Sequence, residues 1–201
     1  MIWPRFFLQG KGERMIERVR EIFQESISVK EKTLEENLDK IQQVVKMLIA
    51  AFDDGKKILI FGNGGSAADS QHIAAEFIGR FRKERQSLPT IALSTDTSIL
   101  TALANDYDFE IIFSRQIEGL GQRGDVALGI STSGNSKNVV KGIQAAKAKG
   151  MKTISLTGQG GGRLAEISDV CIAVPSKVTA RIQESHMTIA HVICELVEEK
   201  F

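Results

Sequence analysis

Four residues with metal-binding or acid–base side chains fall on two segments that have helical patterns. His72 and Glu76 are four positions apart, so they share one face of a helix. Gln183 and His191 are eight positions apart near the end of the chain, two turns along a helix and about eighty degrees round its axis. Imidazole and carboxylate together suit both zinc and proton transfer. The pattern therefore predicts a metal and acid–base site that is divided between two distant segments.

Each of these residues also has an ordinary explanation. A helical histidine is usually a surface residue or a satisfied core residue, and Glu76 alone would be a solvated carboxylate. His186 falls in line with Ile182, Ile189 and Ile193 at helical spacing, so we expect it to pack or to lie at an interface. The functional interpretation therefore depends on what the neighbouring loops add.

A loop rich in hydroxyl groups, Ser131–Ser136, follows the apolar run 126–130 and precedes a helical pattern over 136–149. The unpaired amides and partial positive charge of a helix N-terminus can hold a dianionic phosphate without a cluster of lysines. Plain N-capping by Ser133 or Ser136 is the simpler alternative. Capping needs only one such residue, whereas four of the six residues here carry hydroxyl groups, which favours a phosphate site.

A second loop, Gly62-Asn63-Gly64-Gly65-Ser66, follows the apolar run 58–61. Its glycines permit a tight turn and close approach of a ligand to the backbone. The loop has neither the glycine spacing of a dinucleotide fold nor the Gly-Lys-Ser/Thr ending of a P-loop, so a nucleotide cofactor has no support. We read a third glycine run, Gly158–Gly162, as a flexible turn rather than a ligand cradle.

Five short apolar runs alternate with helical patterns after Gly55 and predict buried strands at 58–61, 90–93, 126–130, 153–156 and 170–174. Such alternation indicates parallel βαβ units. We therefore predict an α/β fold, a three-layer sandwich with a five-stranded parallel sheet, preceded by N-terminal helices. Ligands of such folds gather beyond the carboxyl ends of the strands, where both loops fall.

The segment 14–54 has a helical pattern with one continuous apolar stripe, formed by Leu34, Leu38, Ile41, Val45, Leu48 and Phe52. The stripe either packs on its own domain or meets a second copy across a subunit interface. We treat 1–201 as a single domain in which 14–54 contributes to oligomerisation. The apolar start, Met1–Leu8, is too short for a membrane span or a signal peptide. We read 1–13 as an extension without an assigned function, with Met15 as an alternative start.

The composition of the chain excludes several classes of protein. With 201 residues, 42% of them hydrophobic, the chain can bury one substantial core. Its 26 basic and 25 acidic residues give a net charge of +1, which argues against nucleic acid as a partner. We expect no membrane partner, and Cys171 and Cys194 lie in apolar stretches, as reduced buried thiols do in the cytoplasm.

Three motifs in this order, Gly62–Ser66, Gly129–Ser136 and Arg181-Ile182-Gln183-Glu184, resemble the sugar isomerase (SIS) superfamily. The resemblance runs from the N-terminal helices to the C-terminus and, within the superfamily, is to the isomerases of phosphorylated heptoses. It implies conversion of sedoheptulose 7-phosphate into D-glycero-D-manno-heptose 7-phosphate, the first step towards the activated heptoses of bacterial surface glycans such as lipopolysaccharide. It also implies a cytoplasmic, zinc-dependent homotetramer.

The resemblance assigns roles to matching positions. Zinc would be held by His72, Glu76, Gln183 and His191, with Glu76 and His191 also the catalytic acid–base pair. The substrate would be lined by Asn63, Gly64, Gly65, Glu76, Asn105, Asp106, Ser131, Thr132, Ser133, Ser136 and Gln183. Glutamine is an unusual zinc ligand, so that assignment rests on the resemblance alone. Ala180 stands where some members have an acidic residue, and no role is carried over to it.

An aldose–ketose isomerisation needs a base, an acid for the oxygens and a group that holds the developing negative charge. We expect Glu76 to move the carbon-bound proton, His191 to serve the neighbouring oxygen or carbon, and the ion to polarise the carbonyl. Two alternatives stay open. One is a non-catalytic SIS protein that binds a replication-initiator partner, and the other is an SIS enzyme or sensing domain for a hexose phosphate. The complete set of metal-type residues favours the enzyme.

Overall fold

A computed structural model describes residues 6–201 of the chain, with side chains from residue 12 onward. Residues 1–5, part of the extension to which we assigned no function, lie outside this range. The strands are β1 (Ile58–Gly62), β2 (Thr90–Ala92), β3 (Val126–Ser131), β4 (Lys152–Thr157) and β5 (Val170–Ala173). They form one parallel sheet in the order β2-β1-β3-β4-β5. Each lies within one residue of a predicted apolar run at both ends, and the predicted α/β class is confirmed.

The sheet is buried on both faces, because every residue of β1 and β3 is buried. This is why the strands read as continuous apolar runs rather than alternating ones. β1 and β3 are neighbours, and the chain leaves them towards opposite edges of the sheet, so the topological switch point lies between them. Gly62 pairs with Ile130, which starts the two predicted ligand loops side by side.

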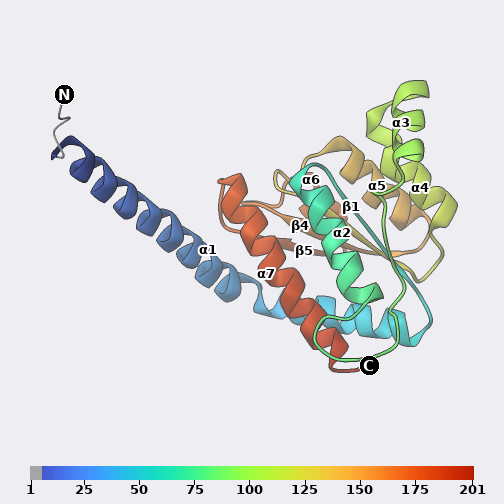
Figure 1. Cartoon of the computed structure of the whole chain (residues 1–201). Coiled ribbons are helices and arrows are strands. Elements are labelled where there is room, and N and C mark those ends of the chain that lie inside the picture. The colour runs from blue at the N-terminus through green and yellow to red at the C-terminus, as the bar shows by residue number, and fades with distance from the viewer. Residues whose placement is uncertain (1–5) are drawn as a thin grey trace.

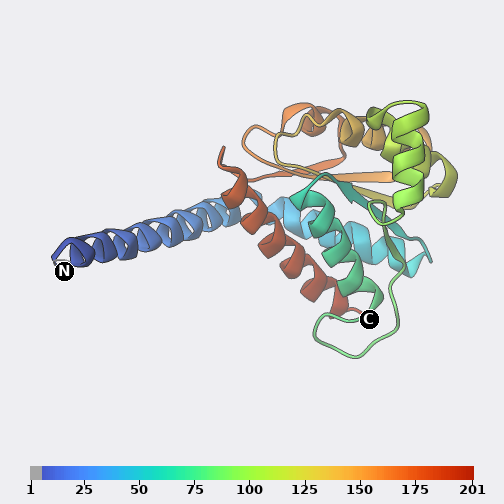
Figure 2. The same ribbon diagram turned by 45° about the horizontal axis from the view of Figure 1, so that its top comes forward.

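Two helical layers cover the sheet (Figure 2). One contains α1 (Phe6–Asp53), α2 (Gly65–Ile78) and α7 (Thr179–Glu198), and the other contains α4 (Ile112–Leu120), α5 (Lys137–Ala148) and α6 (Gly162–Ile167). Each layer has its own apolar core against the sheet. The short α3 (Thr97–Asp106) and the 3₁₀ turn η1 (Phe109–Ile111) lie at the edge of the second layer.

The N-terminal segment is one helix of 48 residues rather than several, and it begins at Phe6 rather than at 14. Its first half projects away from the body, whereas its second half packs under the sheet (Figure 1). Gly55, with φ of 65°, follows the end of the helix. The Gly55 amide donates to the Phe52 carbonyl, and the Lys56 amide donates to the Ala51 carbonyl. Over residues 6–201, no helix has an apolar stretch long enough to cross a membrane.

The apolar stripe of α1 divides into two parts. Ile41, Val45, Leu48 and Phe52 are buried in the core of the same chain. Leu34 and Leu38 are 54% and 58% exposed. The two interpretations of the stripe therefore apply to different halves: one half packs on its own domain, and the other is left uncovered.

His186 is a core residue, as expected from its alignment with the isoleucines of α7. It is 1% exposed, and its Nε2 lies 3.0 Å from the carbonyl oxygen of Thr157 at the end of β4. Burial lowers the pKa of His186 to about 4. The imidazole is therefore neutral at pH 7, with Nε2–H donating to Thr157, and it joins α7 to the sheet.

We predict that acid weakens the fold through His186. The unfolded imidazole takes up a proton near pH 6.5 and the folded one only near pH 4, so protons favour the unfolded chain within this window. Between about pH 7 and about pH 5 the free energy of unfolding should fall by about 2 kcal/mol from this residue. His186→Gln keeps a hydrogen-bond donor for the Thr157 carbonyl but does not titrate. The free energy of unfolding of this variant, measured in urea at fixed protein concentration, should therefore fall less between these two pH values. An unchanged slope in the variant would contradict the assignment.

Candidate active site

The side-by-side packing of α2 and α7 brings three of the four predicted metal-binding residues together (Figure 1). On α2, His72 Nε2 lies 3.0 Å from Glu76 Oε1. From α7, His191 Nε2 approaches His72 Nε2 to 3.5 Å, with the rings edge to face and their centroids 5.2 Å apart. One ligand atom from each of the three lies within 4.8 Å of the other two. All three side chains come from a single chain.

The donor atoms fit a tetrahedral zinc ion. Zinc–nitrogen bonds of about 2.0 Å place two ligand atoms about 3.3 Å apart, and the two imidazole nitrogens are 3.5 Å apart. Two facing imidazole nitrogens are stabilised only when a proton or a cation lies between them. Half of the His72 side chain is exposed, so the site can be reached from solvent.

Gln183, the fourth predicted ligand, lies against the first loop. A Cβ atom at Gly65 would come within 2.3 Å of Gln183 Nε2, so the amide of Gln183 packs directly on the backbone of Gly65. Along α7, Gln183 precedes His191 by about two turns, just as Gly65 precedes His72 along α2. Gln183 therefore lines the junction between the first loop and the helix that carries His191.

A pair of amide side chains joins the first predicted loop to the first turn of α5, which follows the second loop. Asn63 and Asn138 exchange two hydrogen bonds of 2.8 and 2.9 Å across the switch point. In the second loop, Ser131 Oγ lies 3.0 Å from Ser136 Oγ and 3.4 Å from Ser133 Oγ. Ser136 is the N-cap of α5, yet its hydroxyl makes no capping hydrogen bond. The hydroxyls thus gather at the helix N-terminus without the simple capping role considered above.

The glycine run Gly158–Gly162, read from sequence as a flexible turn, supports the second loop. The amide of Gly158 donates to the carbonyl of Thr132, and that of Leu164 donates to the carbonyl of Gly134. Gly134 has φ of 66°, and a Cβ atom there would lie 2.1 Å from the Gly161 carbonyl oxygen. These contacts correct the flexible-turn interpretation, because close packing explains Gly158, Gly161 and Gly162, whereas Gly160 has φ of 80° and open space around it.

Asn105 and Asp106 are not brought to the other predicted residues. They are exposed at the C-terminal end of α3, where Asn105 Nδ2 donates to Asp106 Oδ1 at 2.8 Å. The main contacts of α3 are with η1 and α4, at the edge of the molecule (Figure 1). Within one described chain they lie apart from the three clustered ligands.

Two residues beside the cluster were missed by sequence reasoning. Asp69 precedes His72 by one turn, and its Oδ2 atom is buried without a hydrogen-bond partner. Burial raises the pKa of Asp69 above its usual value, and nearby His72 lowers it in part. Helical spacing from His72 could have identified Asp69. Phe81, whose ring lies 5.3 Å from that of His191, follows α2 in a loop without regular pattern, so no periodicity pointed to it.

The buried thiol of Cys194 is a weak candidate for a metal ligand. Cys194 and Cys171 are both free, and Cys194 is buried in the core near Glu76. Burial, with the nearby Glu76 carboxylate, raises the pKa of Cys194 to about 12. Because a metal binds the thiolate, this raised pKa makes Cys194 a weaker candidate ligand than the two imidazoles.

The sequence matches a family model described as the SIS domain over residues 21–158, a range that contains both loops and α2. The phosphoheptose isomerase of Aquifex aeolicus (strain VF5) is 57% identical over 185 residues, which cover 92% of this chain and 97% of that protein. The phosphoheptose isomerase of Thermodesulfovibrio yellowstonii is 50% identical over 183 residues, covering 91% of each chain.

Solved structures agree with these matches. The phosphoheptose isomerase of Neisseria gonorrhoeae superimposes with a TM-score of 0.88 at 43% identity, over 92% of this chain and 99% of that one. The phosphoheptose isomerase of Francisella tularensis gives a TM-score of 0.89 at 35% identity, over 92% and 98%. The backbone arrangement of this chain is therefore that of solved sugar-phosphate isomerases.

We predict that the contact between the second loop and the glycine run is essential to the fold. Gly134→Ala combines a left-handed φ with a backbone clash, whereas Gly160→Ala has φ of 80° and no atom within 4 Å of the new Cβ. Gly160→Ala should cost about 1–2 kcal/mol of unfolding free energy, and Gly134→Ala at least about 1 kcal/mol more. Urea unfolding of both variants measures the difference, and equal costs would refute the close packing.

Proposed function

We propose that this chain converts sedoheptulose 7-phosphate into D-glycero-D-manno-heptose 7-phosphate. The chain belongs to the phosphoheptose isomerase family of SIS-domain proteins. The family places the chain among the sugar-phosphate isomerases of heptose biosynthesis. The observation that supports the proposed chemistry most is the meeting of a carboxylate and two imidazoles from α2 and α7.

Glu76 and His191 are the proposed catalytic residues. The Glu76 carboxylate would take a proton from C1 of the ketose and return it to C2. His191 would donate a proton to the C2 oxygen as the enediol forms and accept the proton of the C1 hydroxyl as the aldehyde forms. One proton thus moves between carbons and one between oxygens, so that no net proton or electron is exchanged with solvent.

We propose that His72, Glu76 and His191 hold a zinc ion, with Gln183 as the fourth protein ligand on the family resemblance. When bound, zinc would polarise the substrate carbonyl and stabilise negative charge on the enediol oxygens. The spacing of the donor atoms supports zinc. His72 has no proton-transfer role in this scheme and would serve the metal alone.

The opposite end of the substrate would lie in the second loop. Ser131, Thr132, Ser133 and Ser136 would surround the phosphate at the N-terminus of α5. Asn63, Gly64, Gly65 and Gln183 would contact the sugar between the phosphate and the catalytic residues. We retain Asn105 and Asp106 as proposed substrate contacts on the family resemblance, although they lie apart from these groups in a single chain.

We also propose that the enzyme works in the cytoplasm, where phosphorylated sugars are made and where two free cysteines stay reduced. A non-catalytic SIS protein that binds a replication-initiator partner is the less supported reading, because the relatives at 50% and 57% identity are named as isomerases. Isomerase turnover together with zinc content distinguishes the two.

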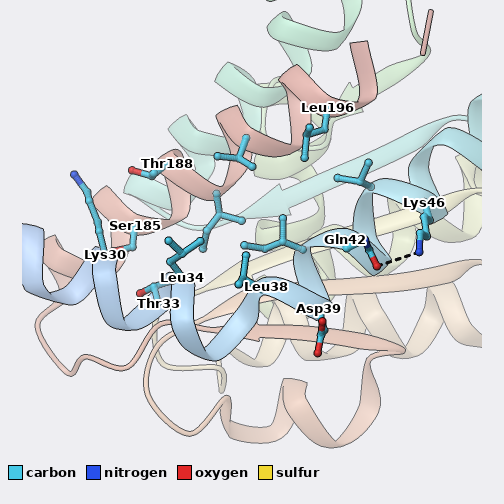
Figure 3. Close-up of a pocket in the computed structure, with 14 residues that line it drawn as sticks. Lys30, Thr33, Leu34, Leu38, Asp39, Gln42, Lys46, Ser185, Thr188 and Leu196 are labelled. Atoms are coloured by element: carbon cyan, nitrogen blue, oxygen red, sulfur yellow. Dashed lines mark hydrogen bonds between the residues drawn. The ribbon is translucent and has the colours of Figure 1, made fainter. Parts of the chain in front are cut away.

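We propose a homotetramer on the family resemblance, and the uncovered apolar surface of α1 and α7 supports association. A groove of about 510 Å³ runs between these helices, lined by Leu34, Leu38, Val192 and Leu196 among others (Figure 3). The projecting half of α1 adds exposed apolar residues, including Val19, Phe23 and Ile27. Apolar surface of this extent on a helix pair is typical of an interface. A second copy of this chain is the proposed occupant.

The catalytic assignment predicts that Glu76→Gln lowers kcat by about 10²- to 10⁴-fold while zinc stays bound. The readout is aldose formation from a panel of phosphorylated ketoses, with zinc content measured on the same samples. Glu195→Gln removes the same charge from an exposed position on α7 and should leave turnover unchanged. Near-normal turnover of zinc-loaded Glu76→Gln would refute the role of Glu76.

The assembly prediction is that Leu34→Glu with Leu38→Glu dissociates the tetramer, because two carboxylates would have to be buried at each interface. Light scattering at micromolar concentration should give a tetramer for the parent protein and smaller species for the variant. Lys32→Glu makes the same change in net charge at an exposed position outside the groove and should not dissociate it. A monomeric parent protein would exclude the proposed assembly.

A further inference from the structure

The ring of Phe81 packs against the imidazole of His191. The two ring centroids are 5.3 Å apart and the planes are inclined by 33°. Phe81 lies in the irregular segment between α2 and β2, which passes the C-terminal end of α7 (Figures 1 and 2). On its other side His191 faces His72, so one side of the imidazole meets a ligand atom and another meets an aromatic ring. A ring held in this way has few rotamers open to it.

The backbone of Phe81 is fixed by a carboxylate from the same helix that carries His191. Glu198 is 3% exposed and accepts hydrogen bonds from the amides of Phe81, at 3.0 Å, and Arg82, at 2.7 Å. Glu198 follows His191 by seven residues, which puts both on one face of α7. α7 therefore supplies both the imidazole and the group that holds the ring against it.

The guanidinium of Arg85 joins this arrangement to α2. Its side chain is 1% exposed and lies 3.4 Å from the Glu198 carboxylate. It donates to the carbonyls of Glu76, at 2.8 Å, and Phe77, at 2.9 Å, in the last turn of α2. Carbonyls at a helix C-terminus lack partners within the helix, and a cation there also interacts favourably with the helix dipole. The buried pair thus joins the turn that contains Glu76 to the last turn of α7.

We propose that Phe81 is a positioning residue for His191, held in place by the buried Arg85–Glu198 pair. This inference rests on the proposed function for the role of His191, but the contacts themselves are properties of the chain. Phe81 limits the rotation of the imidazole, so that Nε2 stays directed towards His72. A residue that only filled space would affect stability, whereas a positioning residue affects turnover of the folded protein.

The test compares Phe81→Leu, which keeps apolar volume but loses the flat ring, with Phe81→Tyr, which keeps the ring. We expect Phe81→Leu to lower kcat by about tenfold, because small misplacements of catalytic groups are costly. KM should stay within about twofold, because the phosphate contacts are untouched. Phe81→Tyr should restore most of kcat. Arg82→Ala removes the neighbouring exposed side chain and its surface ion pair with Glu195. It is the matched control and should keep kcat, because exposed ion pairs contribute little.

A double-mutant cycle tests the link through Glu198. If Glu198 acts on turnover by holding Phe81, Glu198→Gln should lower kcat, and combining it with Phe81→Leu should lower kcat much less than the product of the two single effects. Fully multiplicative effects would overturn this link. Measurements are made well below the unfolding temperature of every variant, with near-UV circular dichroism as the check of folding.

A readout without turnover separates this inference from the proposed function. The chain has 3 histidines, so imidazole signals can be assigned in a ¹H–¹³C NMR spectrum with His191→Gln as the reference. The signals of His191 should move in Phe81→Leu and stay in place in Arg82→Ala. Unchanged His191 signals and unchanged kcat in Phe81→Leu would overturn the inference. Moved signals in a protein that isomerises no heptose phosphate would support the positioning contact and reject the proposed function.

Discussion

The packing of α2 against α7 on one face of the sheet sets the distance between His72 and His191. Neither helix contains a complete metal site, because each contributes only one imidazole. The two nitrogens come within 3.5 Å because the helices run side by side and place the two residues at the same level. The buried contacts of Glu198 and Arg85 at the ends of the two helices stabilise that alignment. The chemistry of the site thus depends on a helix–helix contact.

The sheet supplies the second requirement, a fixed place for the loop that is proposed to bind phosphate. The switch point between β1 and β3 starts two loops side by side, and the Asn63–Asn138 pair joins the first loop to the first turn of α5. The backbone of Gly158–Gly162 packs behind the hydroxyl-rich loop and fixes its shape. α2 begins at the first of these loops, and α7 reaches the same loop through Gln183. The same elements therefore fix the positions of the metal-type cluster and the hydroxyl-rich loop relative to each other.

Sequence reasoning predicted the strands and three of the clustered residues, because apolar runs and i,i+4 spacing are local patterns. It placed the start of α1 too late, since Gly10 and Gly12 have low helix propensity. It read Gly158–Gly162 as a flexible turn, because close packing against another loop leaves no local signal. Phe81 was missed for the same reason: its contact with His191 joins an irregular segment to a helix more than a hundred residues away. Asn105 and Asp106 were expected near the substrate, a location that only the resemblance suggested.

The central claim is that α2 and α7 together hold a zinc ion through nitrogen and oxygen atoms. X-ray absorption spectroscopy at the zinc edge of the zinc-loaded protein tests it most directly. The account predicts about two imidazole nitrogens, with the remaining ligands oxygen or nitrogen, all at about 2.0–2.2 Å. A sulfur ligand at about 2.3 Å, or zinc without imidazole scattering, would contradict it.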